Sequence, residues 1–108
     1  MDKKTEEKIA ELQMIEQSMQ RFLNQKQQFQ TQIVEVDNAL KELSGAKQAH
    51  RIIGNIMVEV DKKKLESDLK SKKEIQELRL KSIEKQEQDI RKKADDIQKE
   101  VMKELNRK

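Results

Sequence analysis

The sequence predicts a mainly α protein, a long antiparallel two-helix coiled coil whose arms are joined by a single central β-hairpin. Proline is absent and glycine occurs only at Gly45 and Gly54, so little interrupts a helix on either side of the middle. Apolar residues recur at heptad spacing in both arms. β-branched residues cluster in the centre, on both sides of Gly54 and Asn55. We therefore expect one domain over residues 1–108, with helices at 5–44 and 62–106 and a hairpin at 49–60.

The first arm carries one continuous apolar stripe. Nine of its ten heptad core positions are apolar, which is typical of a helix with a single packing seam. Lys26 is the exception, and a polar residue at a core position usually fixes the register at some cost in stability. The helix is expected to end at Ser44, with Gly45 in the left-handed C-cap conformation. The core positions are Leu12, Ile15, Met19, Phe22, Lys26, Phe29, Ile33, Val36, Leu40 and Leu43.

The central segment reads as two short strands around a turn at Gly54 and Asn55, two residues that tolerate positive φ. This turn places Ile53 opposite Ile56, and Arg51 opposite Val58. Side chains alternate across a strand, so both faces of the hairpin carry apolar residues. An isolated two-stranded hairpin is marginally stable at best, and this one needs sheet partners that a single chain does not contain. The predicted subunit-assembly residues are Ile52, Ile53, Ile56, Met57, Val58 and Val60.

The second arm has a less regular stripe. Asp61 is the expected N-cap for its helix, with Ser67 as a later alternative. From Ile83 onward the apolar residues keep a clean heptad that only Glu87 interrupts. Between Ile75 and Leu80 the phase of the apolar residues drifts, which predicts a stutter where the two helices locally unwind.

Apolar residues beyond the stripe gather where the two arms should finish together. Met14 lies on the first arm, and Met102 and Leu105 lie on the second. They can widen the local core, or they can form an adaptable binding surface, because the unbranched thioether of methionine repacks around varied partners. Periodicity leaves both interpretations open.

Composition narrows the class of protein. Charged residues make up 42% of the chain and hydrophobic residues 33%, which is low for a compact core. No apolar run reaches the length of a membrane span, the N-terminus lacks the apolar core of a signal peptide, and cysteine is absent. We therefore expect a soluble protein of the cytoplasm.

The sequence contains no pattern that indicates catalysis. The single His50 cannot form a multi-histidine metal site, and we find no nucleophile constellation, phosphate-binding loop or metal-ligand spacing. Acidic residues interleave with the lysines and arginines, and aromatic residues for stacking are scarce, which argues against nucleic-acid binding. We predict a protein that is not an enzyme and that has no cofactor, metal, membrane or nucleic-acid partner.

Three segments resemble the β-type subunits of the prefoldin family, the archaeal members above all. ALKELS at 39–44 resembles the close of the family's first helix, and GNIMV at 54–58 its turn and second strand. LRLKSIEKQE at 78–87 is similar to the most recognisable part of the second helix. The family's α-type subunits carry two hairpins, and the segment from Ser44 to Leu65 has room for one, which indicates a β-type chain.

The resemblance implies a molecular chaperone. Two α and four β subunits would join their hairpins in β-barrels, from which six coiled coils extend. Such a complex holds unfolded proteins at the coiled-coil tips without ATP and delivers them to a group II chaperonin. In this chain the expected client-binding residues lie at the free ends of both arms. They are Ile9, Leu12, Met14, Ile15, Met19, Ile97, Val101, Met102 and Leu105.

Two other functions remain as alternatives. The chain could be a structural coiled coil that oligomerises through its hairpin and binds no client, and suppression of aggregation separates that alternative from a chaperone. It could also bind nucleic acid through its basic second arm, which a steep salt dependence of binding would reveal.

Overall fold

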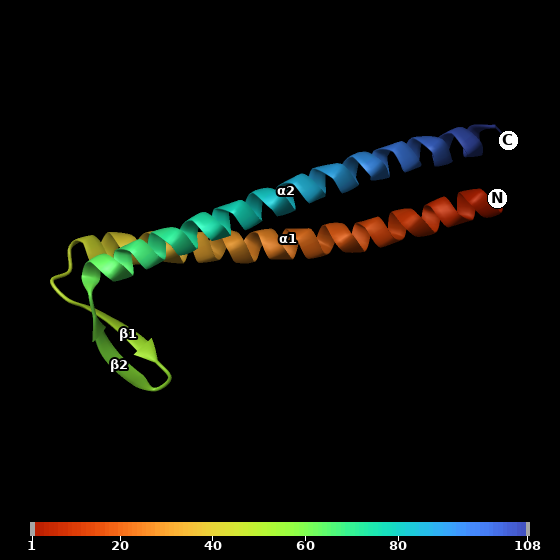
Figure 1. Ribbon diagram of the computed structural model, residues 1–108. Coiled ribbons are helices and arrows are strands. Elements are labelled where there is room, and N and C mark those ends of the chain that lie inside the picture. Colours follow the sequence, from red (N-terminus) through yellow and green to blue (C-terminus); the bar gives the residue numbers. More distant parts are fainter. Residues whose placement is uncertain (1, 108) are drawn as a thin grey trace. The chain divides into compact units, whose positions relative to one another are not determined.

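The computed structural model describes residues 2–107 and has four elements in the order predicted (Figure 1). They are α1 (Lys3–Ser44), β1 (Ala49–Ile53), β2 (Ile56–Val60) and α2 (Lys62–Asn106). The chain divides into two compact units, which are described separately. The hairpin unit is Gln28–Leu80, and the terminal unit is formed by Met1–Gln27 and Lys81–Lys108.

Both helices begin at an aspartate cap. The Asp2 carboxylate accepts a hydrogen bond from the Thr5 backbone N–H at 2.8 Å. The Asp61 carboxylate accepts one from the Lys63 N–H at 3.2 Å, which confirms Asp61 as the N-cap of α2. Each cap satisfies an N–H group that has no partner within the helix.

The end of α1 differs from the sequence-based expectation. Gly45 does not adopt a positive φ, so the left-handed glycine cap was wrong. Side chains satisfy the last carbonyls instead: the Ser44 hydroxyl donates to the Lys41 carbonyl at 2.7 Å, and the Lys62 ammonium donates to the Ser44 carbonyl at 3.3 Å. The Ala46 N–H also donates to the Leu43 carbonyl, at 3.1 Å. With these bonds made, the helix end needs no left-handed residue.

The hairpin has the predicted register. β1 and β2 pair antiparallel, with Ile53 opposite Ile56 and Arg51 opposite Val58. Only Gly54 of the two turn residues has a positive φ, 62°, as the first central position of a type II′ turn requires. This turn matches the twist of the flanking strands, and glycine takes the conformation without a steric cost.

The seam of the hairpin unit keeps its heptad without a stutter. On α2 the covered positions are Leu69, Lys73, Gln76 and Leu80, at alternating spacings of four and three residues. Ile75 and Leu78, 50% and 66% exposed, lie outside the seam. The predicted phase shift was therefore wrong. Polar side chains, Lys73 and Gln76, occupy two seam positions, and the nearby apolar residues Ile75 and Leu78 face outward.

The terminal unit packs the outer halves of the helices antiparallel. Lys8 of α1 forms an ion pair with Glu100 of α2 at 2.9 Å, and Lys26 forms one with Glu87 at 3.5 Å. The α2 residues Ile83, Ile97 and Val101 are buried in the seam of this unit. Neither described helix contains an apolar stretch long enough to cross a membrane.

Candidate interaction surfaces

The hairpin surface consists of the six residues predicted for subunit assembly, Ile52, Ile53, Ile56, Met57, Val58 and Val60. The first five expose between 39% and 72% of their area, although all are large apolar side chains. The strand register places Ile53, Ile56 and Val58 on one face of the hairpin and Ile52 and Met57 on the other. Both faces of the hairpin therefore expose apolar side chains to solvent.

The chain covers only the base of the hairpin. Ala49, the first residue of β1, is buried, and its strand partner Val60 is half-buried. Beyond this base the large apolar side chains are exposed, from 39% at Val58 to 72% at Ile52. The apolar tip of the hairpin therefore receives no cover from its own helices, and an exposed apolar patch of this kind marks an interaction site.

The terminal surface consists of the nine residues predicted for client binding, and the structure separates them into three groups. Met14 and Met102, 69% and 53% exposed, and Leu105 lie open at the surface. Ile97 and Val101 are buried in the seam of the terminal unit. The others are half-buried on α1, and they are Ile9, Leu12, Ile15 and Met19.

A hollow of about 580 Å³ lies beside Met102 on α2. Its other walls include Gln98, Lys99 and Lys103, so the Met102 side chain forms an apolar patch within a polar rim. Ion pairs also join the two helices of this unit. Lys93 lies 3.1 Å from Glu11, and the bond to the Glu100 carboxylate raises the pKa of the Lys8 ammonium.

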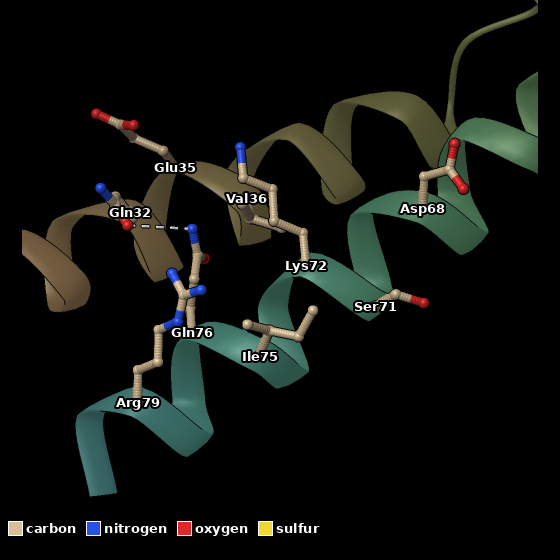
Figure 2. A pocket seen from close by; sticks show the side chains of 9 residues that line it. All are labelled: Gln32, Glu35, Val36, Asp68, Ser71, Lys72, Ile75, Gln76 and Arg79. Atoms are coloured by element: carbon tan, nitrogen blue, oxygen red, sulfur yellow. Dashed lines mark hydrogen bonds between the residues drawn. The ribbon is translucent and has the colours of Figure 1, made fainter. Parts of the chain in front are cut away.

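Polar side chains interrupt the seam of both units, and periodicity alone revealed only some of them. In the hairpin unit Gln76 is 5% exposed, and its Nε2 donates to Gln32 Oε1 at 3.2 Å (Figure 2). Gln76 Oε1 has no hydrogen-bond partner. Lys73 lies 2.6 Å from Asp37, a bond that raises the pKa of the Lys73 ammonium. Extending the heptad backward from Leu80 would have placed Gln76 and Lys73 in the seam.

The described residues contain no group of three or more histidine, cysteine, aspartate or glutamate side chains that could hold a metal ion. The hairpin surface and the terminal surface are built from apolar side chains on exposed elements, a composition typical of sites that bind other macromolecules.

Comparison with known proteins gives a consistent result. A family model described as prefoldin subunit matches residues 6–108. The prefoldin subunit beta of Sulfurisphaera tokodaii is 33% identical over 86% of this chain and 77% of that protein. The prefoldin subunit beta of Archaeoglobus fulgidus is 28% identical over 86% of this chain and 83% of that protein. The crystal structure of the prefoldin beta subunit from Thermococcus strain KS-1 aligns with a TM-score of 0.89 at 25% identity, covering 96% of this chain and 94% of that one.

Proposed function

The chain belongs to the prefoldin subunit family, a family of non-enzymatic chaperone subunits, and from this premise we propose that it is a β-type subunit of a holding chaperone. In this proposal it captures unfolded proteins without ATP and passes them to a group II chaperonin. The whole chain acts as one prefoldin-like domain in the cytoplasm, and each of its two apolar surfaces has a separate task.

The hairpin surface joins this subunit to others. Members of the family assemble with other prefoldin subunits, and we propose two α-type subunits and four copies of this chain. Strand pairing between hairpins would close β-barrels and remove the unpaired edges that β1 and β2 present. Burying a side chain such as Ile56 stabilises such an assembly by about 1.5–3 kcal/mol. Several such residues per subunit supply a substantial driving force for association.

The terminal surface holds the client. The observation that carries this part is the exposure of Met14, Met102 and Leu105 on helices whose seam residues are otherwise covered. Apolar contacts are non-directional, so they suit clients that share no sequence. Several weak surfaces that act on one client also gain affinity through multivalency. A protein that binds unfolded chains and not native ones suppresses aggregation by mass action, without a nucleotide.

The experiment replaces the three exposed residues together, as Met14→Ser, Met102→Ser and Leu105→Ser, in the assembled complex. Because none of them is buried in the seam, the complex should keep its mass and helicity while its protection of a chemically denatured protein from aggregation falls severalfold. Leu23→Ser is the matched control, since Leu23 is an exposed apolar residue of α1 in the same unit but outside the terminal surface. Undiminished protection by the triple variant would exclude the terminal surface as the client site.

A structural coiled coil without clients is the alternative that the same assay separates. The wild-type complex would then give no protection at any ratio to the denatured protein. The exposed hairpin fits both functions, whereas the exposed terminal residues and the membership of the prefoldin family favour the chaperone.

A further inference from the structure

Charged and apolar side chains are sorted around α2 at the terminal surface. Successive residues of an α-helix are turned by about 100° around its axis, so Leu105 lies on one flank of Met102, and Lys99 and Lys103 lie on the other. Both lysines line the hollow beside Met102, and Leu105 is 44% exposed on the opposite flank. This part of α2 therefore has an apolar side next to a basic side.

Neither lysine has an anionic partner in the part of the chain that the structure describes. The carboxylates that directly follow them in the sequence are bound elsewhere. Glu100 lies 2.9 Å from Lys8, and Glu104 lies 3.5 Å from Arg107. No other described carboxylate lies within ion-pair distance of the two lysines, so both ammonium groups are open to a ligand.

The helix dipole explains at most one of the two cations. Lys103 lies in the last turn of α2, where the partial negative charge of the carbonyl groups favours a cation. Lys99 lies one turn earlier, and the effect of the dipole falls off within the last turn. Lys99 thus stabilises the subunit neither through an ion pair nor through the dipole.

The charge next to Met102 is positive, although the Asp95 carboxylate also lines the hollow. Asp95 lies seven residues before Met102, which is roughly 10 Å along the helix axis. Lys99 and Lys103 lie within one turn of Met102. Since the Debye length at physiological ionic strength is about 8 Å, the two lysines dominate the potential at Met102.

The exposed methionine of α1 has a different setting. Three of the four residues one turn away from Met14 are uncharged. The fourth, Glu11, is held by Lys93 at 3.1 Å. Met14 therefore offers an apolar contact without an open charge beside it, and the open cations lie on α2.

We propose that the terminal surface selects clients by charge, and that α2 takes unfolded segments in which apolar residues alternate with aspartate or glutamate. The inference deepens the proposed function and rests on it. Side chains of an extended segment alternate between two sides. One row can then cover Met102 and Leu105 while the acidic row reaches Lys99 and Lys103. Such complementarity raises the rate of encounter and excludes segments of the same charge.

Two unstructured peptides of equal length and identical apolar residues test the selection, one with glutamate and one with lysine at the alternate positions. Each carries the same uncharged dye, and fluorescence anisotropy measures its Kd for the complex of this chain with an archaeal α-type prefoldin subunit. The α-type subunits contribute charges of their own, so the quantity compared between variants is the Kd of the basic peptide divided by that of the acidic one. Lys99→Gln with Lys103→Gln should lower this ratio severalfold, and Lys99→Glu with Lys103→Glu should lower it further. Both differences should shrink in high salt.

Lys81→Glu with Lys85→Glu is the matched control. These lysines are also exposed and four residues apart on α2, in the same unit but outside the terminal surface. Circular dichroism and light scattering establish that each variant folds and assembles. The control should leave the ratio unchanged.

Three results would contradict the proposal in different ways. A ratio that neither variant changes, with both peptides still bound, overturns the charge selection and leaves the proposed function intact. An equal change in the Lys81 and Lys85 control assigns the effect to the charge of the whole arm and overturns the site at Met102. A wild-type complex that binds neither peptide and does not protect a denatured protein contradicts the proposed function, and the selection with it.

Discussion

Isoleucine occupies two opposite environments in this chain. Ile83, in the seam of the terminal unit, is 8% exposed, whereas Ile56, at the tip of the hairpin, is 66% exposed. The seam is a long helical stripe that the chain covers by folding back on itself. The hairpin has two apolar faces and only two strands, so no arrangement of one chain covers it. Apolar residues in the seam therefore stabilise the subunit, and we propose that the same residue type in the hairpin stabilises the assembly.

Polar residues are found where exposure alone would not place them, in the covered seam rather than at the exposed tip of the hairpin. The seam contains Lys26, Lys73, Gln76 and Glu87, each of which interrupts an apolar row. The exposed tip of the hairpin, from Ile52 to Val58, carries no charged side chain. A coiled coil tolerates polar core residues because they fix register, at a cost in stability. An interface that is to be buried between subunits excludes charges that would have no partner.

The largest effect is expected from breaking the hairpin surface. Ile56→Lys with Val58→Lys would bury unpaired ammonium groups in the proposed barrel, at a cost of several kcal/mol. The helices should keep their circular dichroism, while size-exclusion chromatography with an α-type partner should show only unassembled subunits. Leu23→Lys, an equally drastic change at an exposed site outside the hairpin, should leave the complex intact. Assembly of the double variant would show that the hairpin is not the joining element.

The next largest effect is expected from replacing a polar residue of the seam by an apolar one. Gln76→Leu removes a buried oxygen that has no donor, and the exposed Gln32 can bond to water instead. The free energy of unfolding of the isolated chain should rise by about 1–2 kcal/mol. Urea denaturation followed by circular dichroism measures the change. A decrease in stability would mean that the Gln32–Gln76 bond contributes more than the unfilled acceptor costs.

A smaller effect is expected at the ion pair in the seam of the terminal unit. Glu87 is only 14% exposed and contacts both Lys26 and Arg91, at 3.5 Å and 3.7 Å. Lys26→Leu alone should lower the free energy of unfolding by about 1 kcal/mol, because it removes a partner from a nearly buried carboxylate. Lys26→Leu with Glu87→Leu should recover this loss and exceed the wild type. Strict additivity of the two single changes would show that the pair is not coupled.

The smallest effect concerns the pH dependence of the hairpin unit. The bond to Asp37 raises the pKa of Lys73 above its ordinary value of 10.5. The folded chain therefore holds the Lys73 proton more tightly than the unfolded chain does. The stabilisation from the Lys73–Asp37 bond is fully present below the ordinary pKa of lysine. It is lost as the pH rises through the raised pKa of Lys73 in the folded chain. Lys73→Met should therefore lower stability at neutral pH and have less effect above pH 10.5. An equal effect at both pH values would assign the role of Lys73 to packing alone.

Sequence patterns predicted the hairpin register and the seam of α1 because both follow strict rules. Strand pairing around Gly54 and Asn55 has one register once the turn is placed, and the α1 seam has a single polar exception at Lys26. The α2 seam was predicted wrongly near Ile75, because the prediction assumed that seam positions are apolar. In this stretch Lys73 and Gln76 occupy the seam positions. Heptad spacing was the better guide there.

The candidate surfaces were harder to predict than the fold. The client-binding set grouped Ile97 and Val101 with Met102, although the heptad already placed Met102 outside the stripe; the structure confirms that the first two are buried in the seam and the last is exposed. Exposure depends on which side of a helix a residue occupies and on what packs there. The unfilled acceptor of Gln76 also depends on a specific rotamer and its neighbours, which no periodicity contains.

The central claim is that the bare hairpin of this chain is an assembly surface for other subunits, and a mixing experiment tests it most directly. The chain is combined with an archaeal α-type prefoldin subunit, and the mass of the product is measured by light scattering. We predict one species that contains two α-type subunits and four copies of this chain. A chain that stays monomeric in the mixture, with its hairpin exposed, would contradict the claim.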